Sequence, residues 1–172
     1  MGLYKRITIL MLTIILFLIA CGSIFLISST SKVTINGKIH GYLVNSSGDI
    51  LETIQFTLDA KLTEPVLGNE KLKLTISDFP DSLPFHPIAD CDYYEPIPTN
   101  TPRTYYSFTF HLYSSKTGAI EPDNGAINME EGKLILRFKD YDCYLVASSD
   151  PNLDPQALLE NFAIFAKHYP LG

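Results

Sequence analysis

The chain has 172 residues, and its charges are unevenly divided. Residues 1–31 contain two basic residues and no acidic one, whereas residues 32–172 contain 19 acidic and 11 basic residues and carry a formal charge of −8. This balance disfavours nucleic acid as a partner, because phosphate contacts reward clustered Lys and Arg, and it disfavours electrostatic docking on anionic lipid. It suits a soluble, acidic surface.

Residues 1–31 predict a membrane anchor or a lipoprotein signal. Lys5 and Arg6 precede an uncharged run, Ile7–Ile27, of 21 residues. As a helix this run would be about 31 Å long, close to the thickness of the hydrocarbon core of a bilayer. Because the basic residues lie on its N-terminal side, a retained helix would give a single-pass protein of the cell membrane, with residues 32–172 facing outward.

Inside this run, Leu18-Ile19-Ala20-Cys21-Gly22-Ser23 resembles the lipobox of bacterial lipoproteins. The resemblance implies cleavage before Cys21 and attachment of lipid to that residue. The sequence departs from the pattern at Ile24-Phe25-Leu26-Ile27, where lipoproteins usually turn polar. A retained helix, a lipid anchor and an ordinary cleaved signal therefore stay open, and the first two hold the domain at a membrane.

Residues 32–172 predict one extracytoplasmic, mainly β domain, a sandwich or barrel of about seven antiparallel strands. Apolar and polar residues alternate with a period of two, which is typical of half-buried strands. The alternation runs through residues 33–43, 50–62, 71–77, 104–113, 133–139 and 143–147. Asn45–Asp49 joins the first two segments as a hairpin, the last two segments predict another, and Pro122-Asp123-Asn124-Gly125 is typical of a turn.

Residues 79–103 form a proline-rich segment without periodicity. It contains six of the 11 prolines, which lack an amide donor and argue against a central strand. Aromatic side chains on loops are frequent recognition anchors. We therefore predict a binding role for the rings in and beside this segment, Phe85, Tyr93, Tyr94 and Tyr105. The alternative is that these rings cover the edge of the sheet.

Residues 155–168 predict one C-terminal amphipathic helix. Asp154 is suited to cap it, with Pro155 at its first position. Apolar residues then recur at helical spacing at Leu158, Phe162 and Phe165. We expect this helix to pack on the sheet.

Cys91 and Cys143 are the only cysteines after residue 31 and are a candidate disulfide pair, with two free thiols as the alternative. The bridge would close a loop of about 53 residues and stabilise the fold by about 4 kcal/mol in the chain-entropy model. It would also gather four carboxylates, whose oxygens suit Ca²⁺: Asp90, Asp92, Asp140 and Asp142. We favour a solvated acidic surface over a calcium site, and we predict no metal and no cofactor.

Catalytic signatures are absent from the sequence. The four His residues lack metal-ligand spacing, and neither a G-x-S-x-G elbow nor a glycine-rich phosphate loop occurs. Asp150-x-Asn152-x-Asp154 has the oxygen spacing of a calcium loop but lacks the Gly and Glu that such a loop requires.

The hairpin opening Gly37-Lys38-Ile39-His40-Gly41-Tyr42-Leu43-Val44 leads into Ser46-Ser47-Gly48-Asp49-Ile50. With the short anchor and the final helix, it is similar to small uncharacterised membrane-anchored or lipoprotein families of Gram-positive bacteria. This resemblance brings no functional residues. We expect a non-enzymatic binding or accessory module at the cell surface, with the membrane as one partner and a protein or surface ligand as another. An envelope enzyme using clustered carboxylates and a structural spacer are the alternatives.

Overall fold

The computed structural model describes residues 2–27, 29–65, 70–88, 90–91, 94–97 and 105–171. At residues 3, 5–6, 22–27, 29–32, 64–65, 90–91 and 94–97 it describes the backbone alone. The strands are β1 (Ser29–Asn45), β2 (Ile50–Pro65), β3 (Lys71–Ser77), β4 (Phe85–Ile88), β5 (Asp90–Cys91), β6 (Tyr94–Ile97), β7 (Tyr105–Ser114), β8 (Ile120–Asn128), β9 (Lys133–Phe138) and β10 (Cys143–Ser148). The helices are α1 (Gly2–Ile27), α2 (Pro155–Asn161) and α3 (Ala163–His168), with a 3-10 turn at Lys139–Tyr141.

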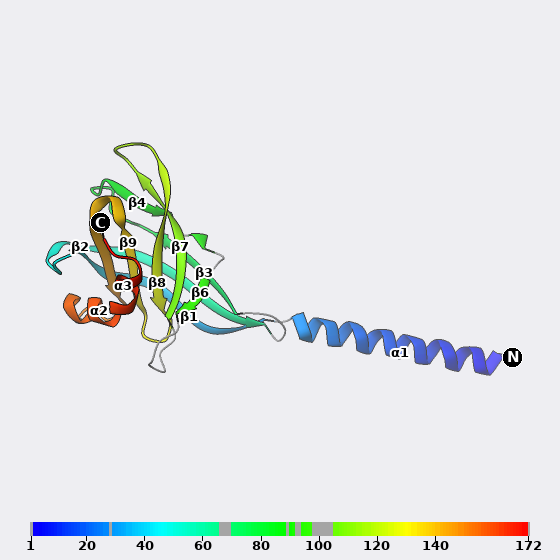
Figure 1. Ribbon diagram of the computed structural model, residues 1–172. Coiled ribbons are helices and arrows are strands. Elements are labelled where there is room, and N and C mark those ends of the chain that lie inside the picture. The colour runs from blue at the N-terminus through cyan, green and yellow to red at the C-terminus, as the bar shows by residue number, and fades with distance from the viewer. Residues whose placement is uncertain are drawn as a thin grey trace.

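The ten strands belong to one antiparallel sheet that curves into a nearly closed barrel (Figure 1). The strand order is β4-β7-β8-β9-β10-β1-β2-β3-β5, and β6 also pairs with β7. The short strands β4, β5 and β6 complete the barrel, because β4 pairs with β7, β5 pairs with β3, and β6 pairs with β7. The mainly β, barrel-like prediction is thus confirmed.

The strand count differs from the predicted seven because the proline-rich segment itself contributes β4, β5 and β6. Pro87 lies opposite Leu112 and Pro96 lies opposite Tyr106, both on strands that pair with β7 alone. A strand with a single neighbour leaves half of its amides without a ladder partner, so it tolerates a missing donor. As predicted, these prolines do not lie on a central strand. They lie on strands that have a single neighbour.

The turn predicted at residues 122–125 is wrong, since these residues lie within β8. Pro122 pairs with His111 of β7, whereas the ladder between β8 and β9 begins only at Gly125, opposite Leu136. On the β9 side Pro122 therefore has no ladder partner to lose. Before Gly125, residues 120–124 of β8 pair with β7 alone, as a two-stranded ribbon.

Side chains of the barrel strands fill its interior. Gly41 and Gly125 show how tightly, because a Cβ at Gly125 would lie 2.7 Å from Leu136 Cδ2 and 2.7 Å from Phe108 Cζ. Members of this interior cluster include Ile39, Phe56, Leu58, Leu74, Phe108, Phe110, Leu134, Leu136, Phe138 and Leu145. Such filling is expected of a narrow barrel, in which inward side chains meet across the axis.

A second buried cluster lies between the barrel wall and the C-terminal helices. It joins Ile135 and Val146 of the wall to Leu158, Phe162 and Phe165. The predicted packing of a C-terminal helix on the sheet is thus observed. Instead of one helix, however, α2 and α3 follow each other with a break at Phe162 (φ −103°, ψ 18°). Asp154 caps α2 as predicted, its carboxylate accepting from the amide of Ala157 at 3.1 Å.

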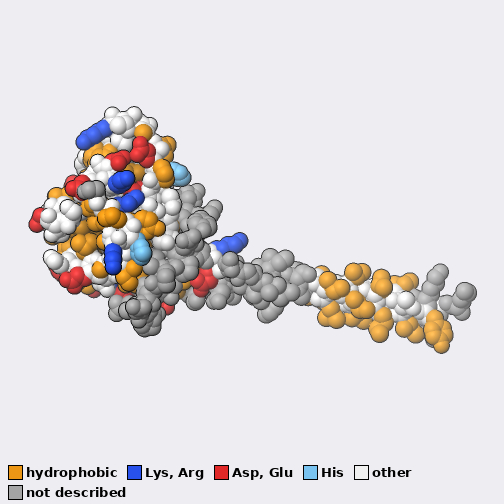
Figure 2. All heavy atoms as spheres, viewed as in Figure 1, with side chains coloured by type: hydrophobic (Ala, Val, Ile, Leu, Met, Phe, Trp, Pro, Cys, Tyr) orange, Lys and Arg blue, Asp and Glu red, His pale blue; other side chains and the backbone are white. Residues whose placement is uncertain are grey.

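The helix α1 extends away from the barrel (Figure 1). Apolar atoms cover much of its surface in the space-filling view (Figure 2). In the described part of the chain, we find no helix that combines the length and the apolar character needed to cross a membrane.

Replacing Phe110 tests the inward face of β7. Its ring is 1% exposed and lies 6.0 Å from the ring of Phe138, so Phe110→Ala should lower the free energy of unfolding by about 3–5 kcal/mol. Thr109, exposed on the same strand, provides the control, and Thr109→Ala should cost much less. Urea titration measures both values, and equal losses would contradict the assigned strand face.

Candidate functional site

The two predicted binding aromatics whose side chains are described both lie in cores. Phe85 is 3% exposed, and its ring lies 4.5 Å from the rings of Phe138 and Tyr141. Tyr105 is 7% exposed and meets Phe162 edge-on at 5.4 Å. These two rings seal the barrel and hold α2, which is the covering role considered as the alternative. Tyr93 and the side chain of Tyr94 lie outside the described residues.

The cysteines are placed on three separate elements. Cys143 is a free, buried thiol of β10, and burial, with a smaller effect of the neighbouring Asp142 carboxylate, raises its pKa to about 12. Cys91 lies on β5, and its side chain is not described. The structure shows Cys143 without a disulfide, and its pairing with Cys91 stays a prediction. Cys21 is exposed on α1, where a lipid could be attached.

The acidic residues around the two cysteines divide between different surroundings. Asp140 lies in the 3-10 turn beside Glu121 of β8, and Asp142 follows that turn with a left-handed backbone (φ 49°). The side chain of Asp90 is not described, and Asp92 lies outside the described residues. Within the described ranges, no group of three or more His, Cys, Asp or Glu side chains is arranged to hold a metal ion.

Two adjoining hollows lie at the end of the barrel opposite α1. Their volumes are about 200 and 330 Å³, and they share Leu112, Glu121 and Asp140. Lys116 and Tyr141 line the smaller hollow, whereas the larger one is lined by Asp123, Arg137 and Lys139. Opposite charges thus alternate across a shallow surface, which can bind a small polar group by hydrogen bonds and ion pairs.

Glu121 and Asp140 form a carboxyl pair between the two hollows. The hydrogen bond to Asp140, the negative charge of that group and a small loss of hydration raise the pKa of Glu121. A neighbouring carboxylate disfavours the ionised form of Glu121, because like charges repel. No sequence pattern indicates this pair, since 19 positions separate the two residues.

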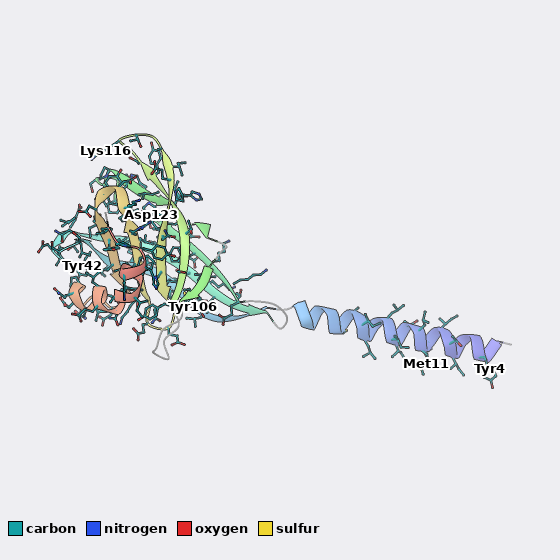
Figure 3. All side chains as sticks on the ribbon, viewed as in Figure 1. Tyr4, Met11, Tyr42, Tyr106, Lys116 and Asp123 are labelled. Atoms are coloured by element: carbon teal, nitrogen blue, oxygen red, sulfur yellow. The ribbon has the colours of Figure 1, made fainter. Side chains whose placement is uncertain are left out.

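The carboxylate of Asp123 connects β8 to β9 where the two strands no longer pair through their backbones. Its carboxylate accepts from Arg137 Nε at 2.7 Å, from the Lys139 amide at 2.9 Å and from the Asn124 amide at 2.8 Å. In Figure 3, Asp123 lies between the levels of Lys116 and Tyr106. The side chains of this ion pair are 6% and 14% exposed, so neither charge is well hydrated and each depends on the other.

Arg137 extends this network to the C-terminal segment. Its guanidinium lies 5.5 Å from the centre of the Tyr169 ring, and the Tyr144 hydroxyl donates to the Tyr169 carbonyl at 2.9 Å. Next to it, an open apolar groove of about 430 Å³ runs between α2, α3 and the start of β10. Its walls include Tyr144, Leu159, Ala163 and Leu171.

Comparison with known proteins found no matching family model, curated protein or solved structure. The resemblance to membrane-anchored and lipoprotein families therefore remains a proposal. The site is defined by its geometry alone.

Replacing Glu121 tests the carboxyl pair through the pH dependence of stability. A folded-state pKa raised above the unfolded value stabilises the fold at low pH, and this contribution is lost as pH rises through the folded pKa. Glu121→Gln keeps a hydrogen-bond donor toward Asp140 and removes the repulsion. Its melting temperature should therefore exceed that of the wild type increasingly between about pH 4 and pH 7.

The control is Glu52→Gln, which removes an exposed carboxylate elsewhere on the sheet. Melting curves of the three proteins across this pH range give the comparison. A difference between Glu121→Gln and wild type that stays constant with pH would contradict the pairing.

Proposed function

We propose that the chain is a membrane-tethered, extracytoplasmic β domain that serves as a binding or accessory module at the cell surface. The observation that carries this proposal is the uncovered apolar surface of α1. Eleven of its large apolar side chains expose between 46% and 67% of their area: Ile7, Ile9, Leu10, Met11, Leu12, Ile14, Ile15, Leu16, Phe17, Leu18 and Ile19. An apolar surface of this extent is unfavourable in water and favours a lipid or protein partner.

The polar side chains of α1 support lipid as that partner. The Thr8 hydroxyl donates to the Tyr4 carbonyl at 2.9 Å, and the Thr13 hydroxyl donates to the Ile9 carbonyl at 2.9 Å. A hydroxyl that bonds within its own helix needs no water, which lowers the cost of transferring it into hydrocarbon. Both threonines are therefore compatible with an apolar environment.

Two modes of attachment fit the same segment. A retained α1 would place Lys5 and Arg6 on the cytoplasmic side and the barrel outside. Cleavage before Cys21 would instead leave a lipid on that residue, eight positions before β1 begins. Either mode holds the barrel close to the outer surface of the cell membrane.

The packing of the barrel supports binding on its outer surface. Because side chains fill the interior, a ligand has the outer hollows, the apolar groove and the barrel ends available. An envelope enzyme is the second candidate, and the pairing of Glu121 with Asp140 favours it. A carboxyl group whose pKa is raised beside a second carboxyl group is an arrangement that general acid and base catalysis can use.

Intact-mass analysis of membrane fractions tests the tether. A retained anchor predicts a protein that keeps Met1 or lacks only that residue, recovered with membranes. A mature N-terminus at Cys21 bearing acyl chains would establish the lipid anchor instead. Recovery of an unlipidated chain from the soluble fraction would contradict both modes.

A further inference from the structure

Lysine side chains gather on the outer face of the barrel beside α1. Lys71 and Lys73 are exposed on β3, and Lys61 is exposed on β2 directly opposite Lys73. Lys71 lies opposite Thr63 in the same ladder. In Figure 2, Lys or Arg side chains project at the end of the barrel nearest α1. The net charge of −8 gives no indication of this group of lysines.

Placing two lysines directly opposite each other disfavours the fold, because opposed side chains in a ladder have Cβ atoms about 5 Å apart. The ion pairs found among the described residues, Lys133–Glu131 and Arg137–Asp123, lie on β9 and its neighbours. Glu70, next to Lys71, accepts from the Tyr106 hydroxyl at 3.0 Å. An external anion would relieve the repulsion between Lys61 and Lys73.

We infer that Lys61, Lys71 and Lys73 form a basic face that binds the anionic phospholipid headgroups of the membrane holding α1. This inference rests on the proposed tether. The register fixes the distances, because Ser29, two residues after the end of α1, lies opposite Pro65 at the end of β2. Counting from Pro65 at about 3.3 Å per residue gives the height of each lysine.

Lys71, opposite Thr63, stands about 7 Å above Pro65, and the Lys61–Lys73 pair stands about 13 Å above it. The headgroup layer extends about 6 Å beyond the hydrocarbon, and electrostatic attraction acts over a further 8 Å or so at physiological salt. The level of Pro65 and Ser29 stands up to about 7 Å beyond the end of α1, and the long, flexible lysine side chains can extend back toward the membrane by a comparable distance, so the three ammonium groups come within range of headgroup charge. The carboxylates at the opposite end of the barrel lie outside it.

Lys38 provides a matched control on the same face. It is exposed on β1 opposite Thr57, which places it about 26 Å above Pro65 and beyond the range of the headgroups. Among the described side chains of β2 and β3, Asp59 is an exposed acidic residue of this face, and it stands at about 20 Å, also outside that range. The lysines near α1 and the distant Lys38 should therefore respond differently to lipid charge.

Acetylation of lysines by a water-soluble amine reagent, read by mass spectrometry, tests this face in the full chain. The chain is reconstituted in bilayers of phosphatidylcholine alone or of phosphatidylcholine with phosphatidylglycerol. Each lysine near an anionic surface gains about fivefold in binding, so acetylation of Lys61, Lys71 and Lys73 should slow by about that factor in the anionic bilayer. High salt should abolish the difference, and Lys38 should react equally in both bilayers.

The paired substitution Lys71→Gln with Lys73→Gln separates charge from steric cover. It should remove most of the protection of Lys61, whereas Lys38→Gln should leave that protection unchanged. Equal acetylation of Lys61, Lys71 and Lys73 in both bilayers would overturn the basic face. Protection of Lys61 that survives the paired substitution would overturn it as well.

Flotation with phosphatidylcholine vesicles tests the membrane attachment of the chain separately from the basic face. If the chain floats but its lysines are acetylated equally in both bilayers, the basic face is overturned and the proposed tether is unaffected. A chain that does not float with these vesicles overturns the tether and this inference together.

Discussion

The packed interior of the barrel is the constraint on which the other features of the molecule depend. The inward faces of the strands meet across the axis, and a Cβ at Gly41 would lie only 2.7 Å from Leu145 Cδ1. Overpacking a well-filled core typically costs several kcal/mol, so additional atoms are not readily admitted there. Ligands and partners must therefore bind on the outer surface of the barrel. The interior likewise offers no place for the apolar side chains of α1.

Charge on the outside of the barrel is organised by strand register. Arg137 and Asp123 are neighbours because β8 leaves β9 at Gly125, and their ion pair secures the end of the barrel opposite α1. Lys61 and Lys73 are neighbours because β2 and β3 pair near the other end. One barrel thus carries a carboxyl pair with two hollows at one end and a lysine face at the other. The net charge of the domain therefore describes neither end of the barrel.

Strand positions and their inward faces were predictable where alternation was regular. In β3 the exposed and buried residues alternate from Lys71 to Ser77 as the sequence predicts, and Phe110 points inward while Thr109 points outward. The short strands between residues 85 and 97 and the start of β8 were missed for one reason. Their prolines were interpreted as breaks, although a strand with one neighbour tolerates proline.

The candidate sites were harder to predict because they depend on contacts between strands. Phe85 and Tyr105 have the chemistry of both a recognition anchor and a core residue, and only their burial decides between these roles. The pairing of Glu121 with Asp140, and of Lys61 with Lys73, depends on register, which one sequence without its fold does not specify. Because residues 122–125 were predicted as a turn, the hydrogen bonds and ion pair by which Asp123 joins β8 to β9 were not predicted.

A single tryptophan tests most directly whether α1 lies in lipid while the barrel lies in water, because the chain has no tryptophan of its own. Phe17→Trp places the probe on α1, and Tyr113→Trp places it on the exposed face of β7. In bilayers containing phospholipids brominated along the acyl chain, the fluorescence of Phe17→Trp should be blue-shifted and quenched, and that of Tyr113→Trp should be neither. Fluorescence of Phe17→Trp that is quenched by aqueous iodide and unaffected by brominated lipid would contradict the tether.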